Sequence, residues 1–233
     1  MKHSGDWPFV SVILAVKNGE RFLAEAIRSV AAQNYPAYEL MVVDGHSTDR
    51  TAEIARSFPE AQFLTQPGHG LPAAWNFGLA QAHGEWIALL EHDDVWLPEK
   101  LRTQIRFMRQ RPELQFTLSR AEFFLEPGCA WPPGYNPGWL KAPQIGSMLS
   151  AFVARKSAFD GVGKFDEQLQ RAADMDWLAR AKDRQIPMAY LAETLVRKRV
   201  HDTNVTRQTQ LNNAELLQVI RRTVERKREA NHA

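Results

Sequence analysis

The residues best suited to chemistry follow a short apolar run at 86–90 (WIALL). Glu91, Asp93 and Asp94 come directly after that run, and His92 lies among them. Short apolar runs of this kind are typical of strands buried on both faces of a parallel sheet. Carboxylates at the end of such a strand suit a hard divalent cation that also holds a phosphate. The alternative is a solvated acidic turn before the next helix.

Side chains alternate along an extended chain, so the acidic stretch has two sides. We therefore expect Glu91 and Asp93 to point to the same side. His92 and Asp94 should point to the other, away from a metal held by the first pair. His92 has two possible roles: it either contacts a ligand or simply packs in the protein or faces solvent.

Alternating strand and helix patterns precede this stretch. Apolar runs predict strands at 9–16, 38–43 and 61–66, and helices are predicted from Glu20, from a cap at Ser47 or Thr48, and from 71 to 82. Three strand–helix units and a fourth strand predict a parallel sheet with right-handed crossovers. Asn18 and Asp44 follow the first two strands as Glu91 and Asp93 follow the fourth, so these groups should share one edge of the sheet.

The second half of the chain is less regular. Its patterns predict helices at about 98–111 and 173–184, strands at 115–125 and 147–154, and a closing pair of strands at 188–191 and 195–200. The intervening segment 126–146 is rich in proline, glycine and aromatic residues, and loops of this length are usually functional or disordered. Trp131, Tyr135 and Trp139 could pack on sugar rings or cover the sheet edge.

Asp174 and Asp176 are a second pair of candidate acids, at the start of the helix predicted at 173–184. The helix N-terminus should keep Asp174 ionised. The two side chains do not share a helix face, so at most one of them reaches a common site.

Composition excludes several classes of protein. The 233 residues are 44% hydrophobic and 24% charged, which fits one large α/β domain or a domain with a small appendage. A net charge of +2 gives no global basic field for nucleic acid. Cys129 is the one cysteine, which excludes an intramolecular disulfide and is typical of a reducing compartment. Because we find neither a signal peptide nor a membrane span, we expect a cytoplasmic protein, with peripheral attachment to the inner membrane face left open.

The last segment, from Gln208, is predicted to be a basic helix. Its apolar residues Leu216, Leu217, Ile220 and Val224 lie on one stripe. We expect this stripe to pack on the protein or to form a homodimer, and contact with a membrane surface is a second possibility.

Several stretches together resemble the family-2 glycosyltransferases with the GT-A nucleotide-sugar fold. The first two stretches are 10–19 and 42–49, and the third consists of 76–79 and 84–87, which lead to 91–94. The later stretches are 163–167, 173–177 and 197–201. Residues 91–94 (EHDD) occupy the place of the family's DXD metal motif. Each stretch alone is weak, but their order over residues 9 to about 206 makes the resemblance specific.

The resemblance implies an α/β GT-A fold, with a mostly parallel Rossmann-like central sheet flanked by helices, a smaller acceptor-side mixed sheet and a C-terminal helix. Residues 1–206 would form a single domain. About 1–112 would be its nucleotide-sugar-binding half and about 113–206 its acceptor and catalytic half. Residues 207–233 would be the basic amphipathic helix.

The resemblance also implies an activity: metal-dependent, inverting transfer of a sugar from a nucleoside-diphosphate donor to a hydroxyl. A UDP-sugar is the first candidate for the donor, and a carbohydrate or lipid-linked molecule for the acceptor, as in polysaccharide biosynthesis. Asp174 would be the general base. Asp93 would be the principal ligand of Mn²⁺ or Mg²⁺, with Glu91 and His201 as further ligands.

Other residues would bind the donor: Ala15, Lys17, Asn18, Glu20, Asp44, Asn76, Glu91, His92, Arg199 and His201. Among them, Asp44 would bind the base, and Arg199 and His201 the diphosphate. The chemistry is consistent, because a positioned carboxylate can deprotonate an acceptor hydroxyl and cations can stabilise a leaving diphosphate.

This sequence departs from the family pattern at five positions: Ala15, Lys17, Gly45, Glu91 and Ala173. The first three put the identity of the donor base in doubt, and Glu91 changes the geometry of the metal motif. These departures leave open a nucleotide-sugar-binding homologue without turnover. A nucleotidyltransferase would need a Gly-rich loop after the first strand, and the turn at 17–19 is too short for one.

Overall fold

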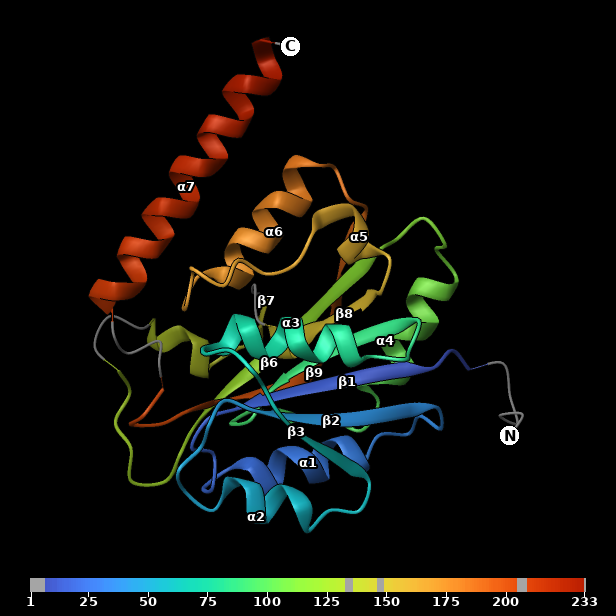
Figure 1. Cartoon of the computed structure of the whole chain (residues 1–233), viewed down its shortest axis with the longest axis vertical. Helices are drawn as coiled ribbons and strands as arrows, with labels where there is room; N and C mark the ends of the chain where they lie inside the picture. The colour runs from blue at the N-terminus through green and yellow to red at the C-terminus, as the bar shows by residue number, and fades with distance from the viewer. Residues whose placement is uncertain (1–6, 133–135, 146–148, 205–208, 233) are drawn as a thin grey trace.

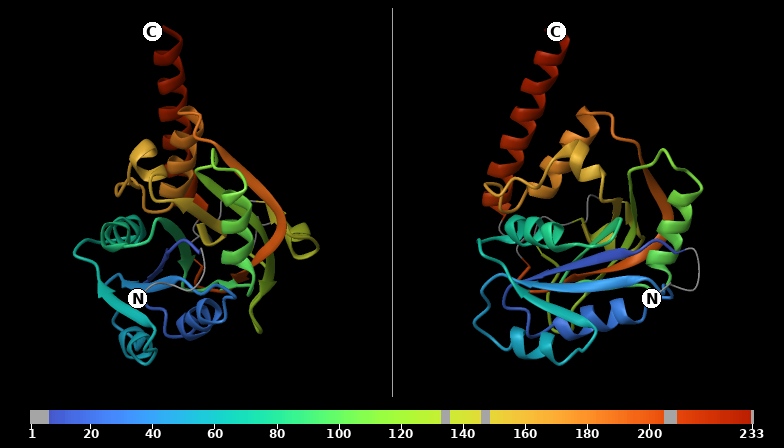
Figure 2. Two further views of the ribbon diagram at one scale, coloured as in Figure 1. Left: turned by 90° about the vertical axis from the view of Figure 1, so that its right-hand side faces the viewer. Right: turned by 45° about the vertical axis from the view of Figure 1, so that its right-hand side comes forward.

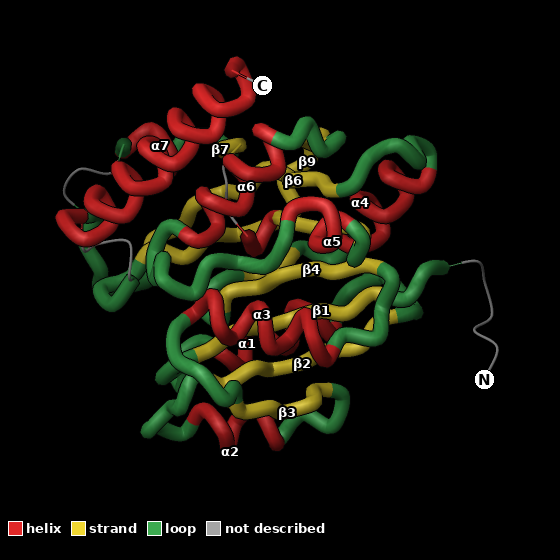
Figure 3. Tube along the Cα trace, turned by 45° about the horizontal axis from the view of Figure 1, so that its top comes forward, coloured by secondary structure: helices red, strands yellow, loops and turns green. Residues whose placement is uncertain are grey.

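The computed structural model describes residues 7–132, 136–145, 149–204 and 209–232. Within these ranges, nine strands form one sheet in the order β3-β2-β1-β4-β8-β6-β9-β5, with β7 paired to β6 (Figures 1 and 3). The strands are β1 (Val10–Val16), β2 (Tyr38–Asp44), β3 (Ala61–Thr65), β4 (Trp86–Glu91), β5 (Val95–Trp96), β6 (Phe116–Leu125), β7 (Gln144–Ile145), β8 (Phe152–Arg155) and β9 (Met188–Val200).

Helices cover both faces of this sheet. They are α1 (Leu23–Ala31), α2 (Thr51–Arg56), α3 (Leu71–Gln81), α4 (Lys100–Arg109), α5 (Ala158–Val162), α6 (Ala173–Asp183) and α7 (Thr209–His232), with 3₁₀ turns η1 (Pro137–Leu140) and η2 (Leu149–Ala151). In Figure 1, α1 and α2 lie below β1 and β2, and α3 lies above them. The predicted apolar stripe of α1 is buried, including Leu23, Ile27 and Val30. The expected cap of α2 by Ser47 or Thr48 is wrong, because α2 begins at Thr51 without a side-chain cap.

The first half of the sheet is parallel, as predicted. β1 pairs in parallel with β2 and β4, and β2 pairs with β3. All seven residues of β1 are buried, as expected for a strand covered on both faces. The register sets Ala15 beside Glu91, and Val16 beside Asp44. The carboxyl ends of these strands therefore meet at one edge.

The second half of the sheet is mixed and continues the first. β8 is antiparallel to both β4 and β6, while β9 is parallel to β6 and antiparallel to β5. The predicted fold class is thus confirmed. The predicted closing pair of strands is wrong, because 188–200 is one strand with register shifts against β6 beside Arg120. The short elements α5, β5 and β7 were not predicted, since so few residues carry no periodic pattern.

Helix α6 is fixed on the sheet by one aromatic residue. Trp177 is fully buried, and its ring lies 5.3 Å from Phe116 and 5.4 Å from Phe152, measured between centroids. These partners belong to β6 and β8. Trp177 thereby holds α6 against β6 and β8.

Helix α7 packs against α6 and then extends away from the body of the protein (Figure 2). Its contact centres on the buried Val219, and Arg222 pairs with Asp166 at 2.6 Å. Leu217, Ile220 and Val224 of the predicted stripe are exposed, so the helix packs through a neighbouring face. Self-association and membrane contact through α7 stay predictions. In the part of the chain that the structure describes, no helix has the length and apolar character of a membrane span.

The aromatic loop packs against the sheet. The ring centroids of Trp131 and Trp139 lie 6.4 Å and 5.2 Å from that of Phe123 on β6. This arrangement favours the interpretation that these residues cover the sheet. Tyr135 lies outside the described residues.

Candidate functional site

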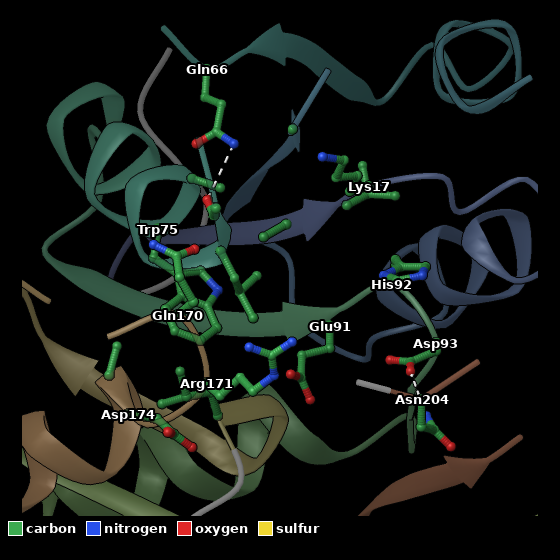
Figure 4. A pocket seen from close by; sticks show the side chains of 18 of the residues that line it. Lys17, Gln66, Trp75, Glu91, His92, Asp93, Gln170, Arg171, Asp174 and Asn204 are labelled. Carbon is green, nitrogen blue, oxygen red and sulfur yellow. Dashed lines mark hydrogen bonds between the residues drawn. The ribbon is translucent and has the colours of Figure 1, made fainter. Parts of the chain in front are cut away.

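A cavity of about 600 Å³ lies where the ends of β1 and β4 meet the starts of α3 and α6 (Figure 4). Its wall includes six residues predicted for the site, namely Ala15, Lys17, Glu91, His92, Asp93 and Asp174. Candidates that lie more than 80 residues apart in the sequence therefore share one space. The wall does not include the other predicted residues, Asn18, Glu20, Asp44, Asn76, Arg199 and His201.

Three of the predicted residues outside the wall, namely Asn18, Glu20 and Asp44, form hydrogen bonds within and between the loops around the cavity. The Thr48 N–H donates to Asn18 Oδ1 at 2.9 Å, and the Arg50 N–H donates to Glu20 Oε2 at 3.2 Å. These bonds tie the loop after β1 to the loop after β2. Asp44 is buried beside the wall residue Gly45 and accepts the Ser47 N–H at 3.1 Å. Their roles toward a donor stay predictions.

Asn76 connects α3 to the segment before α6. Its Nδ2 donates to the Phe165 carbonyl at 2.9 Å, and the Phe165 N–H donates to its Oδ1 at 3.0 Å. Nδ2 also lies 2.9 Å from Glu167 Oε1. The amide thus joins α3 to the segment before α6, and its predicted donor contact is untested.

The acidic stretch forms a compact cluster. β4 ends at Glu91, and the Asp94 N–H donates to the Glu91 carbonyl at 3.1 Å, closing a turn. Glu91 and Asp93 face the same cavity, as predicted, but the prediction that His92 and Asp94 point to the other side is wrong, because alternation requires an extended chain. One carboxylate oxygen from each of Glu91, Asp93 and Asp94 lies within 4.8 Å of the others. Asp94 is fully buried and belongs to this cluster rather than to the opposite side.

Lys198 lies at the centre of this acidic cluster. Its Nζ donates to Glu91 Oε2 at 2.5 Å and to Asp94 Oδ2 at 3.0 Å. Burial alone would lower the pKa of Lys198, but the charges of Asp94, Glu91 and Asp93 outweigh it and raise that pKa well above its ordinary value. Sequence reasoning missed this residue. Its one signal was a place between Arg197 and Arg199 in a basic strand.

Asp93 is held in its ionised form. His201 Nε2 and Asn204 Nδ2 each lie 3.0 Å from its Oδ2. Burial would raise the pKa of Asp93, but the Lys198 charge and the His201 hydrogen bond hold it well below its ordinary value. Asn204, a wall residue, belongs to the sequence motif at 204–206 that matches a glycosylation acceptor, and its role beside Asp93 was missed.

Arg199 and His201 lie behind Asp93. Arg199 Nε donates to the Asp93 carbonyl at 3.1 Å, and its guanidinium pairs with Glu25 and Glu126. The His201 ring is buried against Phe22, with 4.6 Å between their centroids. Both side chains position the Asp93 segment, while their predicted contacts with a diphosphate or metal remain untested.

Asp174 lies across the cavity from Asp93 (Figure 4). Burial raises its pKa to about 7, and the charge of Glu91 adds to this, whereas the Met175 N–H opposes it. The prediction that the helix N-terminus keeps Asp174 ionised is therefore wrong, because burial outweighs the backbone hydrogen bond. Asp176 is buried and pairs with Arg180 at 2.7 Å. As expected, only one of the two acids reaches the cavity.

The far end of the cavity contains polar groups that were not predicted. Gln66 is buried, and its Oε1 accepts no hydrogen bond from the described residues. Gln170 and Arg171 line the wall between Gln66 and Asp174 (Figure 4). Trp75 is buried and also forms part of the wall.

The curled α/β sheet, with an acidic cluster at the end of β4 beside a cavity, defines a protein of the GT-A class. The family model described as "Glycosyl transferase family 2" matches residues 11–154. The chain belongs to this family and is a transferase enzyme.

Relatives and solved structures agree with this assignment. An uncharacterized glycosyltransferase of Rickettsia typhi is 31% identical over 92% of this chain and 71% of its own length. TarS of S. aureus in complex with UDP-GlcNAc superposes with a TM-score of 0.74 at 20% identity, covering 94% of this chain and 66% of that one. The mannosyltransferase PcManGT of Pyrobaculum calidifontis, in complex with GDP-Man and Mn²⁺, gives 0.73 at 17% identity, over 94% and 65% of the two chains. The two structures support the GT-A fold.

Proposed function

We propose that this chain transfers a sugar from a nucleoside-diphosphate donor to an acceptor hydroxyl, with inversion at the anomeric carbon. The observation that carries the proposal is the shared cavity, which joins an acidic cluster with an ionised Asp93 to a separate carboxyl group, Asp174, with a pKa of about 7. Two carboxylates in such different environments suit two different roles. Family membership and the nucleotide-sugar complexes of TarS and PcManGT support this choice of donor.

The donor base would bind at the end of the cavity formed by Ala15, Lys17, Gly45 and Gln66. The buried Oε1 of Gln66 lacks a partner among the described residues, and a base N–H would satisfy it. Lys17 offers a positive charge nearby. A uracil base is the first candidate, because uracil has one ring N–H beside two carbonyl groups.

The diphosphate would lie beside the acidic cluster, where Asp93 and Glu91 would hold Mn²⁺ or Mg²⁺. Their carboxylate oxygens are the hard donors that these cations prefer, and the low pKa of Asp93 keeps it available as a ligand. A divalent cation there would offset the charge that develops on the leaving diphosphate. His201 would orient Asp93 from behind through its 3.0 Å hydrogen bond.

Asp174 would act as the general base. In its ionised form it would accept the proton of the attacking hydroxyl, and a pKa near the working pH suits that role. The acceptor, a carbohydrate or a lipid-linked sugar, would enter between Asp174 and the donor. Binding both substrates in one cavity supplies part of the rate acceleration.

The test is the release of nucleoside diphosphate from a panel of nucleotide-sugars with Mn²⁺. We expect turnover of at least one donor by the wild-type protein and none by Asp93→Ala. Asp160→Ala is the matched control, because Asp160 is exposed on α5 away from the cavity and should keep full activity. Saturable donor binding without release from any donor would instead support a binding protein without turnover.

A further inference from the structure

Lys198 occupies the place of a counter-ion within the acidic cluster. Its side chain is 16% exposed, and its ammonium group contacts Glu91 and Asp94 at 2.5 Å and 3.0 Å. It reaches the cluster from β9, more than 100 residues further along the chain. The protein thus brings its own cation to the point where three carboxylates converge.

Both oxygens of Asp94 already accept hydrogen bonds within the protein. Its Oδ2 accepts hydrogen bonds from Ser150 Oγ at 2.6 Å and from Lys198, and its Oδ1 accepts the Arg199 N–H at 3.2 Å. By contrast, Glu91 Oε1 and Asp93 Oδ1 accept no hydrogen bond from any described residue. Among the described residues, these are the two carboxylate oxygens of the cluster that are most open to an incoming cation.

We propose that Lys198 is a tethered counter-ion that keeps the acidic cluster assembled without a metal and limits the affinity of the cluster for a free divalent cation. The ammonium group stands in contact with two of the three carboxylates, so it both neutralises them and repels a second cation. The negative charge of a nucleoside diphosphate offsets this repulsion, which makes cation binding depend on the nucleotide. This inference rests on one part of the proposed function, namely that the divalent cation binds at the acidic cluster.

Lys198 is therefore a positioning residue, and its role differs from that of a lysine that is merely buried. Lys100 provides the comparison. It is fully buried, whereas Lys198 is partly exposed, and the Nζ of Lys100 lies 4.3 Å from the centroid of the Trp96 ring and 3.4 Å from the Phe152 carbonyl, without a carboxylate partner among the described residues. Replacing Lys100 removes a buried ammonium group without changing the acidic cluster.

The experiment measures the binding of Mn²⁺ alone, without nucleotide, from the paramagnetic resonance signal of the free ion. Lys198→Met should bind Mn²⁺ roughly tenfold or more tightly than the wild type, because three carboxylates then lack their internal cation. Lys198→Arg keeps the positive charge and should resemble the wild type. Lys100→Met is the matched control and should show no gain.

Thermal unfolding gives a second readout. In chelator, Lys198→Met should unfold at a lower temperature than the wild type, because like charges are left unpaired. Added Mn²⁺ should restore its unfolding temperature, while the wild type should respond little.

Each of three results would overturn the proposal. They are an unchanged Mn²⁺ affinity in Lys198→Met, an equal gain in Lys100→Met, and a Lys198→Met protein that stays unfolded in Mn²⁺. Because these measurements contain no donor, they are independent of whether the wild type turns over a nucleotide-sugar.

Discussion

The two ends of the cavity place aspartates in opposite environments. Asp93 accepts hydrogen bonds from His201 and Asn204 and lies near the charge of Lys198, which together hold its pKa well below the ordinary value. Asp174 faces the cavity without a salt bridge among the described residues, and burial raises its pKa to about 7. The same side chain is thus a fixed anion at one end and a proton acceptor at the other.

This difference follows from how each end is built. At the Asp93 end, the carboxyl ends of β4 and β9 converge, although β8 and β6 lie between these two strands in the sheet, and they supply acids and cations to the same point. The Asp174 end is the first turn of one helix, supported from below by the apolar contacts of Trp177. Ion pairs define the first end and desolvation defines the second.

Removing the carboxylate of Asp174 should give the largest difference between the two ends of the cavity, because it should impair sugar transfer but not donor binding. We expect Asp174→Asn to lower sugar transfer by about 10²–10⁴-fold, the range for loss of a general base. Donor binding in the presence of Mn²⁺ should stay almost unchanged, because Asp93 and Glu91 are intact. The measurement is steady-state transfer together with donor affinity, with Asp160→Asn as the exposed control. Unchanged transfer would move the base role to another residue.

The pH dependence should distinguish the same two ends. With a pKa of about 7, Asp174 is protonated below pH 7, so transfer should fall by roughly tenfold per pH unit in that range. Glu91 and Lys198 face Asp174 with opposite charges, and burial is the larger influence on its pKa. The pH profile of transfer at saturating donor is the measurement. A flat profile between pH 5 and 8 would contradict the assignment.

The raised pKa of Asp174 should also make the free energy of unfolding depend on pH. Between its ordinary pKa and about 7, Asp174 holds a proton in the folded state that the unfolded state has released. Its contribution to the free energy of unfolding is therefore present at low pH and is lost as the pH rises through 7. The stability of Asp174→Asn relative to the wild type should then increase over this range.

The parallel half of the fold could be predicted because its signals are local. Apolar runs gave β1 and β2, the stripe with Leu23 and Ile27 gave α1, and the polar residues after each strand indicated the ligand edge. Asp93 and Asp174 line the same cavity, which agrees with the predicted site. Their chemical roles remain predictions.

The rest of the site depends on contacts that a local pattern does not contain. Lys198 meets Glu91 across 107 positions, and Asn204 meets Asp93 across 111. The orientation of Asp94 depends on a turn that overrides strand alternation, and the raised pKa of Asp174 depends on burial by distant segments. In each case the tertiary environment outweighs the local rule.

The smallest expected effect concerns the support of the Asp174 end by α7. Glu215 Oε2 accepts the N–H groups of Arg171 at 2.7 Å and Ala172 at 3.0 Å, directly before α6 begins. Glu215→Gln keeps the shape but loses the charge, and we expect the free energy of unfolding to fall by about 1 kcal/mol. Glu225→Gln, at an exposed position of the same helix, should have no effect.

Transfer should fall slightly in Glu215→Gln, because Asp174 lies three residues after Arg171. Mn²⁺-dependent donor binding should not change, since the acidic cluster makes no contact with Glu215 among the described residues. Calorimetric unfolding and paired measurements of transfer and donor affinity would check this. If donor binding weakened in parallel with transfer, the two ends of the cavity would be coupled, and their separation into an ionic end and a desolvated end would be too simple.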